Sequence, residues 1–311
     1  MPDYPLGLQG RPFPYHVKTT ADHWWPKGLQ RLWVDQDGYV SLINPCGEVK
    51  SAKPPQKGSS KTGFAHKRGG HKLQFGVSPW NHTFEPDFEK IDNAGPPILK
   101  HIAKQLEGGD EVLFGPSEVE RTTNTLIKLC FSLMVRSPAF RYLYSRSGEL
   151  FGLGYNEETG KANIQQFWSF ASQIDLKKCN SGNLLLLHAE NSEFCFGDGL
   201  YDTIFSRPVS WRPQGMHWVA DLIGDAFIPL LPNVCAYLYF LRGGFGSKIQ
   251  LFPVTSNIVK EVNTLTQIYS KEQLFFRAVC PTLTPEYRRR EHLMVSTGQI
   301  PLIEMLRTRV S

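Results

Sequence analysis

Histidines are concentrated at one end of this 311-residue chain, because six of the nine lie within the first 101 residues. Imidazole and carboxylate groups suit a divalent transition metal, and they also act as acid and base near neutral pH. We therefore expect His23 and His71 to bind a metal or activate water, with Glu85 assisting as a base. The polar residues around these histidines are Asp22, Arg68, Asn81, Glu85 and Asp87.

A carboxylate far along the chain is a further candidate. In EFCFGDGLYD an apolar segment ends abruptly at Gly197-Asp198-Gly199. A side chain at a glycine-flanked strand end faces a cleft, and glycine lets a ligand approach the backbone. We expect Asp198 to serve as a catalytic group and a metal ligand together with His23 and His71. The alternative is a turn in which Asp198 caps its own backbone.

Standard signatures are absent, which limits the chemistry. The chain has no H-E-x-x-H, C-x-x-C, G-x-x-x-x-G-K-[ST] or G-x-S-x-G string, so a zinc-protease site, a P-loop and a serine nucleophile elbow are excluded. Histidines that merely pack beside tryptophan remain an alternative to a metal site.

A basic segment covers residues 50–72. Between Glu48 and Lys72 there are seven lysines and arginines, and the net charge of the whole chain is +5. Because the segment is rich in Gly, Ser and Pro, we expect a loop that carries function. Lys67, Arg68 and Lys72, with the distant Arg136, are expected to bind phosphate. A solvated insertion without function is the alternative.

Composition sets the general class. Charged residues make up 20% and hydrophobic residues 41%, which excludes intrinsic disorder. No apolar run reaches the roughly 18 residues that span a bilayer. The six cysteines are widely spaced, and the N-terminus does not resemble a secretory signal. We expect a soluble, cytoplasmic protein that does not contact membranes.

Periodicity predicts the elements that would position these residues. Asp37-Gly38 predicts a hairpin with strands near 31–35 and 39–43. Helices are expected at 98–106, behind Pro96-Pro97, and from a Ser117-x-x-Glu120 capping box to Pro138. Further helices are expected at 161–175 and 257–279, and buried strands at NLLLLHAE, EFCF, AFIPL and VCAYLYFLR.

These elements predict one α+β domain over residues 1–311. Its mixed or antiparallel sheet would be built from the N-terminal hairpin and the C-terminal strands, with inserted helices and a central helical part at about 96–176.

Five short strings give the chain a family resemblance. HWWP at 23–26 is similar to a variant of the H-Y-V-P motif of the domain of unknown function 4238 family, and RSPAFR, FCFGDG, FIPLLP and VNTLTQ resemble its later motifs. The sequence departs from the family in Trp24-Trp25 and in lacking a proline after Asp198. The resemblance implies a single domain in which His23, Arg136 and Asp198 converge, and it implies no activity.

The residues together predict a phosphodiester hydrolase, a metal-dependent nuclease acting on nucleic acid with a divalent ion. A non-catalytic module that binds nucleic acid or a protein partner within a multi-protein system is an open alternative, with lysines of 50–72 on phosphate and Trp25 or Trp80 on bases. A purely structural subunit is a third.

Overall fold

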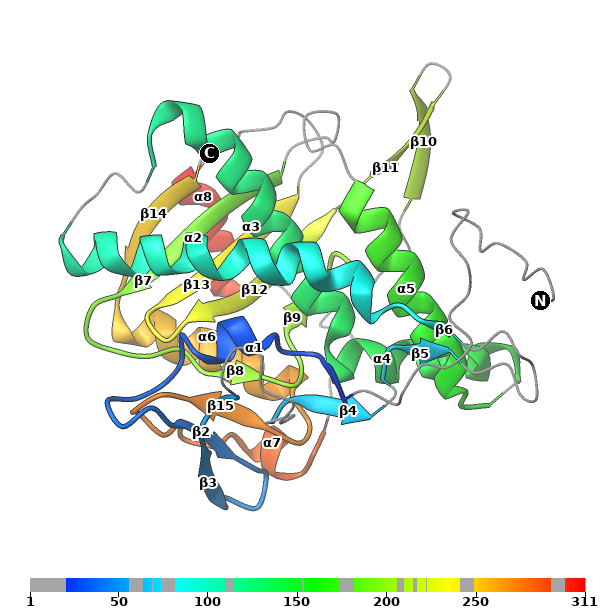
Figure 1. Cartoon of the computed structure of the whole chain (residues 1–311), viewed down its shortest axis with the longest axis horizontal. Helices are drawn as coiled ribbons and strands as arrows, with labels where there is room; N and C mark the ends of the chain where they lie inside the picture. The colour runs from blue at the N-terminus through cyan, green and yellow to red at the C-terminus, as the bar shows by residue number, and fades with distance from the viewer. Residues whose placement is uncertain are drawn as a thin grey trace, which may run out of the picture.

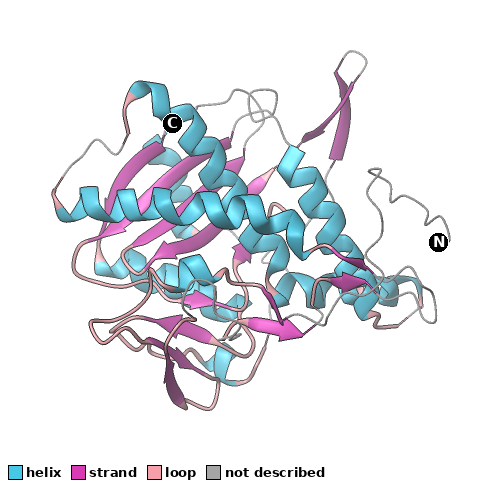
Figure 2. Cartoon of the chain, viewed as in Figure 1, coloured by secondary structure: helices cyan, strands magenta, loops and turns pink. Residues whose placement is uncertain are grey.

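The computed structural model describes residues 21–55, 64–68, 70–73, 82–109, 114–152, 154–173, 182–205, 210–214, 217–221, 223–240, 249–291 and 300–310. These residues form the α+β fold that the sequence predicts, with a central sheet, a second small sheet and helices around both (Figures 1 and 2).

The central sheet has five strands in the order β14-β7-β13-β12-β9. Only the β14–β7 pair is parallel, and the other pairs are antiparallel. The predicted strands NLLLLHAE, AFIPL and VCAYLYFLR are confirmed as β7, β12 and β13. The bounds are β7 Gly182–Ala189, β9 Tyr201–Asp202, β12 Gly224–Leu231, β13 Val234–Phe240 and β14 Ile249–Val254.

Both faces of this sheet are covered, which explains why β12 and β13 are buried at every position. Leu184 and Leu186 point into a cluster with α2 and α3, whereas Leu185 and Leu187 point into a cluster with α6 and α8. Figure 1 shows α2 and α3 in front of the sheet. The bounds are α2 Glu89–Glu107, α3 Pro116–Arg136, α6 Ser256–Tyr269 and α8 Pro301–Val310.

The second sheet is antiparallel, in the order β3-β2-β15-β8. Of the predicted strand EFCF at 193–196 only Phe196 is in a strand, the edge strand β8, and residues 193–195 are not. Two further short strand pairs, β1 with β4 and β5 with β6, contain His23, His66 and His82, and His71 directly precedes β5. The bounds are β1 Ala21–His23, β2 Val40–Ile43, β3 Val49–Ala52, β4 His66–Arg68, β5 Lys72–Leu73, β6 His82–Thr83, β8 Phe196–Gly197 and β15 Leu274–Phe276.

The remaining elements complete the frame. The predicted helix at 161–175 is confirmed as α5, which buries Ile164, Trp168 and Ala171. The bounds are α1 Lys27–Gln30, η1 Glu85–Phe88, α4 Pro138–Ser145, η2 Ser147–Phe151, α5 Glu157–Gln173, β10 Ser210–Gln214, β11 His217–Asp221 and α7 Pro285–Arg288.

The predicted hairpin at Asp37-Gly38 is wrong. Asp35 and Gly38 do form a tight turn, with Gly38 at a φ of 79°, but residues 31–35 are not a strand. The strand at 40–43 pairs instead with Val49–Ala52, across a turn that places Gly47 at a φ of 85°. Asp37-Gly38 therefore forms a turn, but no strand precedes it.

Three predicted helix limits are also wrong. Helix α2 starts at Glu89, so Pro96 and Pro97 lie inside it. Helix α6 ends at Tyr269 rather than near 279, because the chain turns into β15. The predicted capping box is absent, since Pro116 occupies the first turn of α3 and the helix has no side-chain cap, while Ser117 is exposed.

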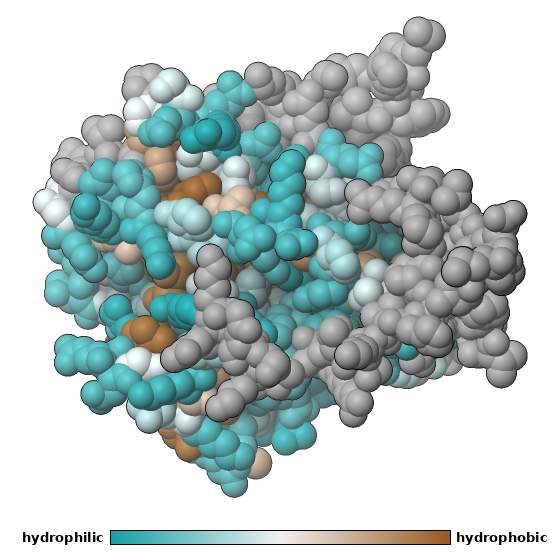
Figure 3. Space-filling model, in the orientation of Figure 1, coloured by the Kyte–Doolittle hydropathy of each residue, from teal (hydrophilic) through white to brown (hydrophobic). Residues whose placement is uncertain are grey.

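The described surface in Figure 3 is mostly hydrophilic, as expected when the apolar side chains form an internal core. On the face shown in Figure 3, hydrophilic side chains cover most of the described surface and apolar groups are small. Among the described residues, no helix combines the length and apolar character needed to cross a membrane.

Candidate functional site

Three potential metal ligands meet where the two short strand pairs adjoin. Asp22 lies in β1, His71 directly precedes β5, and Glu85 opens η1 just after β6. Within the described part of the chain these three form the one group of at least three His, Cys, Asp or Glu donors with ligand atoms within 4.8 Å of one another. We call them the Asp22–His71–Glu85 cluster.

The cluster is anchored by the backbone as well as by side chains. The amide of His71 donates to Oδ2 of Asp22 at 2.7 Å, and Nδ1 of its ring hydrogen-bonds Oε2 of Glu85. The ring contacts Phe84 and Phe88, each with centroids 5.2 Å apart. Nε2 of His71 is buried and has no hydrogen-bond partner among the described residues. Glu85, whose side chain is 29% exposed, is the ligand that solvent reaches.

Burial controls the charge of this cluster. Desolvation lowers the pKa of His71 well below its usual value, and the nearby charges of Arg141 and Arg136 lower it further. Burial also raises the pKa of Glu85, although Arg136 and His23 oppose that shift. His71 is therefore neutral near pH 7, which is the form that a metal ligand requires.

His23 lies beside the cluster without belonging to the group of three. Its backbone amide hydrogen-bonds Glu85, and its ring lies 5.9 Å from the ring of His66, its partner in the β1–β4 register. Of the three expected metal ligands, His71 belongs to the group of three potential donors, and Asp22 and Glu85 rather than His23 and Asp198 lie beside it.

Asp198 belongs to a different local structure. Its carboxylate accepts hydrogen bonds from the amides of Lys271 at 2.8 Å and Glu272 at 2.9 Å, so it caps a distant turn rather than its own. Burial raises its pKa to about 6, against the opposing effect of these amides. Asp198 is not in the Asp22–His71–Glu85 group.

Arg136 does not have the environment expected of a phosphate ligand. The residue is fully buried, and its guanidinium donates to both carboxylate oxygens of Asp92 and to Ser132. Phe88 covers it, with the ring centroid 4.3 Å from the guanidinium carbon. The structure therefore corrects the prediction that Arg136 binds phosphate: Arg136 packs on Phe88, which in turn contacts the ring of His71.

The basic segment is only partly described. Residues 56–63 and the side chain of Arg68 lie outside the described residues, whereas Lys67 forms an ion pair with Glu157 and Lys72 is half-buried at the start of β5. Trp80 is also outside them. Trp25 is 1% exposed and stacks on Phe196 with centroids 4.6 Å apart, so it offers no face to a base.

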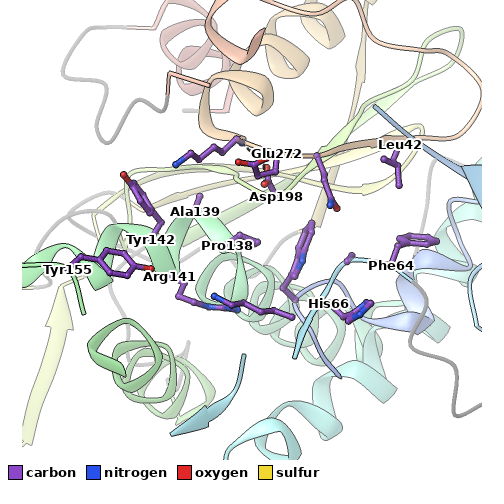
Figure 4. Close-up of a pocket in the computed structure, with 15 residues that line it drawn as sticks. Leu42, Phe64, His66, Pro138, Ala139, Arg141, Tyr142, Tyr155, Asp198 and Glu272 are labelled. Atoms are coloured by element: carbon purple, nitrogen blue, oxygen red, sulfur yellow. Dashed lines mark hydrogen bonds between the residues drawn. The ribbon is translucent and has the colours of Figure 1, made fainter. Parts of the chain in front are cut away.

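A cavity of about 450 Å³ is lined by Arg141 and Asp198, and Asp22, His71 and Glu85 are not among its lining residues. Figure 4 shows Arg141 and Asp198 on facing sides, with Tyr142 and Tyr155 at one end and Phe64 at the other. Ala65, which precedes His66 in the chain and lines the cavity, has a φ of 56°. This is a strained backbone conformation of the kind found at functional sites. Other lining residues are Trp24, Leu42, His66, Lys67, Pro138, Ala139, Lys271, Glu272 and Gln273.

Arg141 connects the cavity with the cluster. It extends from α4, lines the cavity, and is 4% exposed. Its charge acts on His71, and Asp22 acts on it. Gly70 permits this position, because a Cβ there would lie 3.2 Å from Nη2 of Arg141. Of the two arginines, Arg141 rather than Arg136 therefore lines the cavity.

Two residues of this site escaped the sequence analysis. Asp22 was noted only as a neighbour of the histidines, and its role depends on pairing with β4 more than 40 residues later. Arg141 ends the RSPAFR string, where Ser137-Pro138 is a recognisable helix start that would have placed it one turn inside a helix. No signal in the sequence marked its burial.

Comparison with known proteins gives no relative. No protein-family model, no curated protein and no solved structure matches this chain. The resemblance to the domain of unknown function 4238 family therefore stays a prediction, and the site has to be interpreted from its own geometry.

Proposed function

We propose that this chain is a metal-dependent phosphodiester hydrolase that acts on nucleic acid. The observation that carries the proposal is the position of Arg141, which lines the cavity and also acts electrostatically on His71 and Asp22. A phosphate bound to Arg141 would therefore be held by a side chain that interacts with His71 and Asp22, although Asp22, His71 and Glu85 do not themselves line the cavity.

The donor set of the cluster fits a divalent ion. Two carboxylates and one neutral imidazole suit ions such as Mn²⁺, Fe²⁺ or Zn²⁺ better than the soft ions that thiolates select. An ion bound there would polarise a phosphoryl oxygen and lower the pKa of a water molecule. Glu85, the solvent-accessible member with a raised pKa, is suited to accept a proton from that water.

The charge around the cavity supports an anionic substrate. Arg141, Lys67 and Lys271 line it, and of these Lys67 forms an ion pair with Glu157. Of the two acids in the lining, Asp198 is bound by backbone amides and Glu272 lies 3.5 Å from Arg290. A guanidinium matches the geometry of phosphate and favours its binding.

A second candidate is a nucleic-acid-binding module without catalysis. The observation in its favour is that two hydrogen bonds hold the cluster together without an ion: neutral His71 donates Nδ1–H to Glu85, and Asp22 accepts the His71 amide. The cavity would then bind nucleic acid without cleaving it.

Metal content and nucleic-acid cleavage separate these candidates. The purified protein should contain a stoichiometric divalent ion by mass spectrometry, cleave a labelled single-stranded RNA or DNA oligonucleotide, and stop cleaving when EDTA removes the ion. Glu85→Gln should lower the cleavage rate by at least the roughly 10- to 100-fold that even outer-shell changes cost metal sites. Glu89→Gln, an exposed acid at the start of α2, is the matched control and should have no effect.

Two results would contradict the hydrolase. Binding of oligonucleotides without cleavage and without a bound ion would favour the binding module. Cleavage that persists in Glu85→Gln at the wild-type rate would place the catalytic centre elsewhere.

A further inference from the structure

We propose that the cavity binds one nucleotide of a single strand, with its phosphate on Arg141 and its base against Tyr142 and Tyr155. This inference rests on the proposed function, because it names the substrate unit that the hydrolase would position.

Arg141 has the environment of an anion ligand. It is 4% exposed, it lines the cavity, and its Nε–H has no hydrogen-bond partner among the described residues. A buried donor without a partner costs free energy, so a ligand that accepts its hydrogen bond gains affinity. A planar guanidinium offers donors in a fork that matches two oxygens of a phosphate. Burial, the main factor, lowers the pKa of Arg141, yet a guanidinium remains charged near neutral pH.

The tyrosines give one end of the cavity an aromatic surface. The rings of Tyr142 and Tyr155 lie 6.4 Å apart at 43° to each other. Tyr155 is 55% exposed at the opening, an unusual position for so large an apolar ring. Nζ of Lys271 lies 4.3 Å from the centre of the Tyr142 ring and adds positive charge to the same end. Aromatic rings with nearby cations are the usual platform for stacking a base.

Size and topology favour a single unpaired unit. A volume of about 450 Å³ is in the range of small-ligand sites and accommodates one nucleotide rather than a duplex. A paired base could not reach the tyrosines without leaving its stack. Figure 4 shows Tyr142 and Tyr155 at the end of the cavity beside Arg141, so one ligand can contact Arg141 and an aromatic ring.

Binding measured without catalysis tests the inference. Titration of the wild-type protein with 5′-AMP, 5′-UMP, adenosine and inorganic phosphate, in EDTA and by calorimetry, should give the tightest binding for the two nucleotides. Adenosine, which lacks the phosphate, should bind at least about 10-fold more weakly than 5′-AMP, as expected when a charge-assisted contact is lost.

Two variants assign the two halves of the ligand. Arg141→Gln should lower the affinity for 5′-AMP to that for adenosine, and Arg141→Lys should restore part of it. Tyr155→Ala, at an exposed position, should weaken the binding of 5′-AMP by about 10-fold, which is the loss typical of one stacked base. The affinity for inorganic phosphate should stay unchanged. Arg121→Gln, at an 82% exposed position on α3 outside the cavity lining, is the control and should alter neither.

The outcomes separate this inference from the proposed function. Equal affinity for 5′-AMP and adenosine, or no change in Arg141→Gln and Tyr155→Ala, would overturn the nucleotide site even if metal-dependent cleavage is found. Phosphate-dependent binding through Arg141, in a protein that never cleaves, would support the nucleotide site and contradict the hydrolase.

Discussion

Arg136 of α3 donates two hydrogen bonds to the carboxylate of Asp92 in α2, at 2.9 and 2.7 Å, and so joins the two longest helices behind the candidate site. The same guanidinium lies over Phe88, which in turn contacts the ring of His71. A fully buried arginine with both carboxylate oxygens as partners is a structural ion pair. Arg136, which the sequence predicted to bind phosphate, therefore joins the helices that support the candidate site.

This pair gives the first prediction. Asp92→Asn should lower the free energy of unfolding by about 3 kcal/mol, because it leaves the Arg136 charge buried with a neutral partner. Chemical denaturation at pH 7 measures the change.

Arg121→Gln on the same helix is the control for this prediction. Arg121 has an 82% exposed side chain, so its loss should change stability by less than about 1 kcal/mol. Equal effects of the two changes would mean that the buried pair adds nothing beyond a surface contact.

Two serines beside helix starts give the second prediction. Oγ of Ser137 accepts the amide of Phe140 at 3.1 Å and caps α4, the helix that carries Arg141. Ser137→Ala should cost about 1 kcal/mol, whereas Ser117→Ala, at an exposed position that caps nothing, should cost only a few tenths. Thermal unfolding of the two variants compares them, and a larger loss for Ser117→Ala would reverse the assignment of the cap.

The strands and the amphipathic helix could be predicted because their signals are local. A run such as VCAYLYF is apolar at every position, and a sheet covered on both faces needs such a run. Likewise Ile164, Trp168 and Ala171 repeat with helical spacing and are buried.

The errors arise where a distant partner decides the structure. Val40–Ile43 pairs with the strand that follows it rather than the segment before Asp37-Gly38, because the preceding residues pack Trp33 into the core, where its indole donates to Leu230. Pro96 lies inside α2 because η1 had already started the chain on a helical course at Glu85.

The candidate site likewise has one part that the sequence predicts and another that it does not. The histidine-rich start of the chain contains the Asp22–His71–Glu85 cluster, in which His71 hydrogen-bonds Glu85. Asp22 reaches His71 only through the pairing of β1 with β4, and the burial of Arg141 results from contacts with α5 and Gly70. Neither relationship has a period or a motif that a single sequence displays.

Asp198 gives the third prediction, a dependence of stability on pH. Burial raises its pKa from 3.8 to about 6 in the folded protein, so between these values the folded state binds more protons than the unfolded chain. Stability should therefore decrease as the pH rises from about 4 to 6, and this contribution should stay constant above that range. The full effect is on the order of 3 kcal/mol.

Denaturation at pH 4, 5, 6 and 7 tests this sign. The wild-type free energy of unfolding minus that of Asp198→Asn should fall across the range, because asparagine does not titrate. A difference that rises with pH would show that the amides of Lys271 and Glu272 outweigh desolvation and hold the pKa of Asp198 below its usual value.

Gly70 gives the last prediction, which tests whether the position of Arg141 matters. A Cβ at residue 70 would lie 3.2 Å from Nη2 of Arg141 and 3.2 Å from the carbonyl oxygen of Lys67, closer than an ordinary contact. The carbonyl is fixed by its hydrogen bond with the amide of Gly70, so the guanidinium has to move. Gly70→Ala should therefore weaken 5′-AMP binding several-fold, since a charge-assisted hydrogen bond depends on its geometry, while stability changes by less than about 1 kcal/mol. Gly115→Ala is the control, because a Cβ there meets nothing within 4 Å. Unchanged affinity in Gly70→Ala, with the protein folded, would mean that Arg141 does not contact the ligand from its observed position.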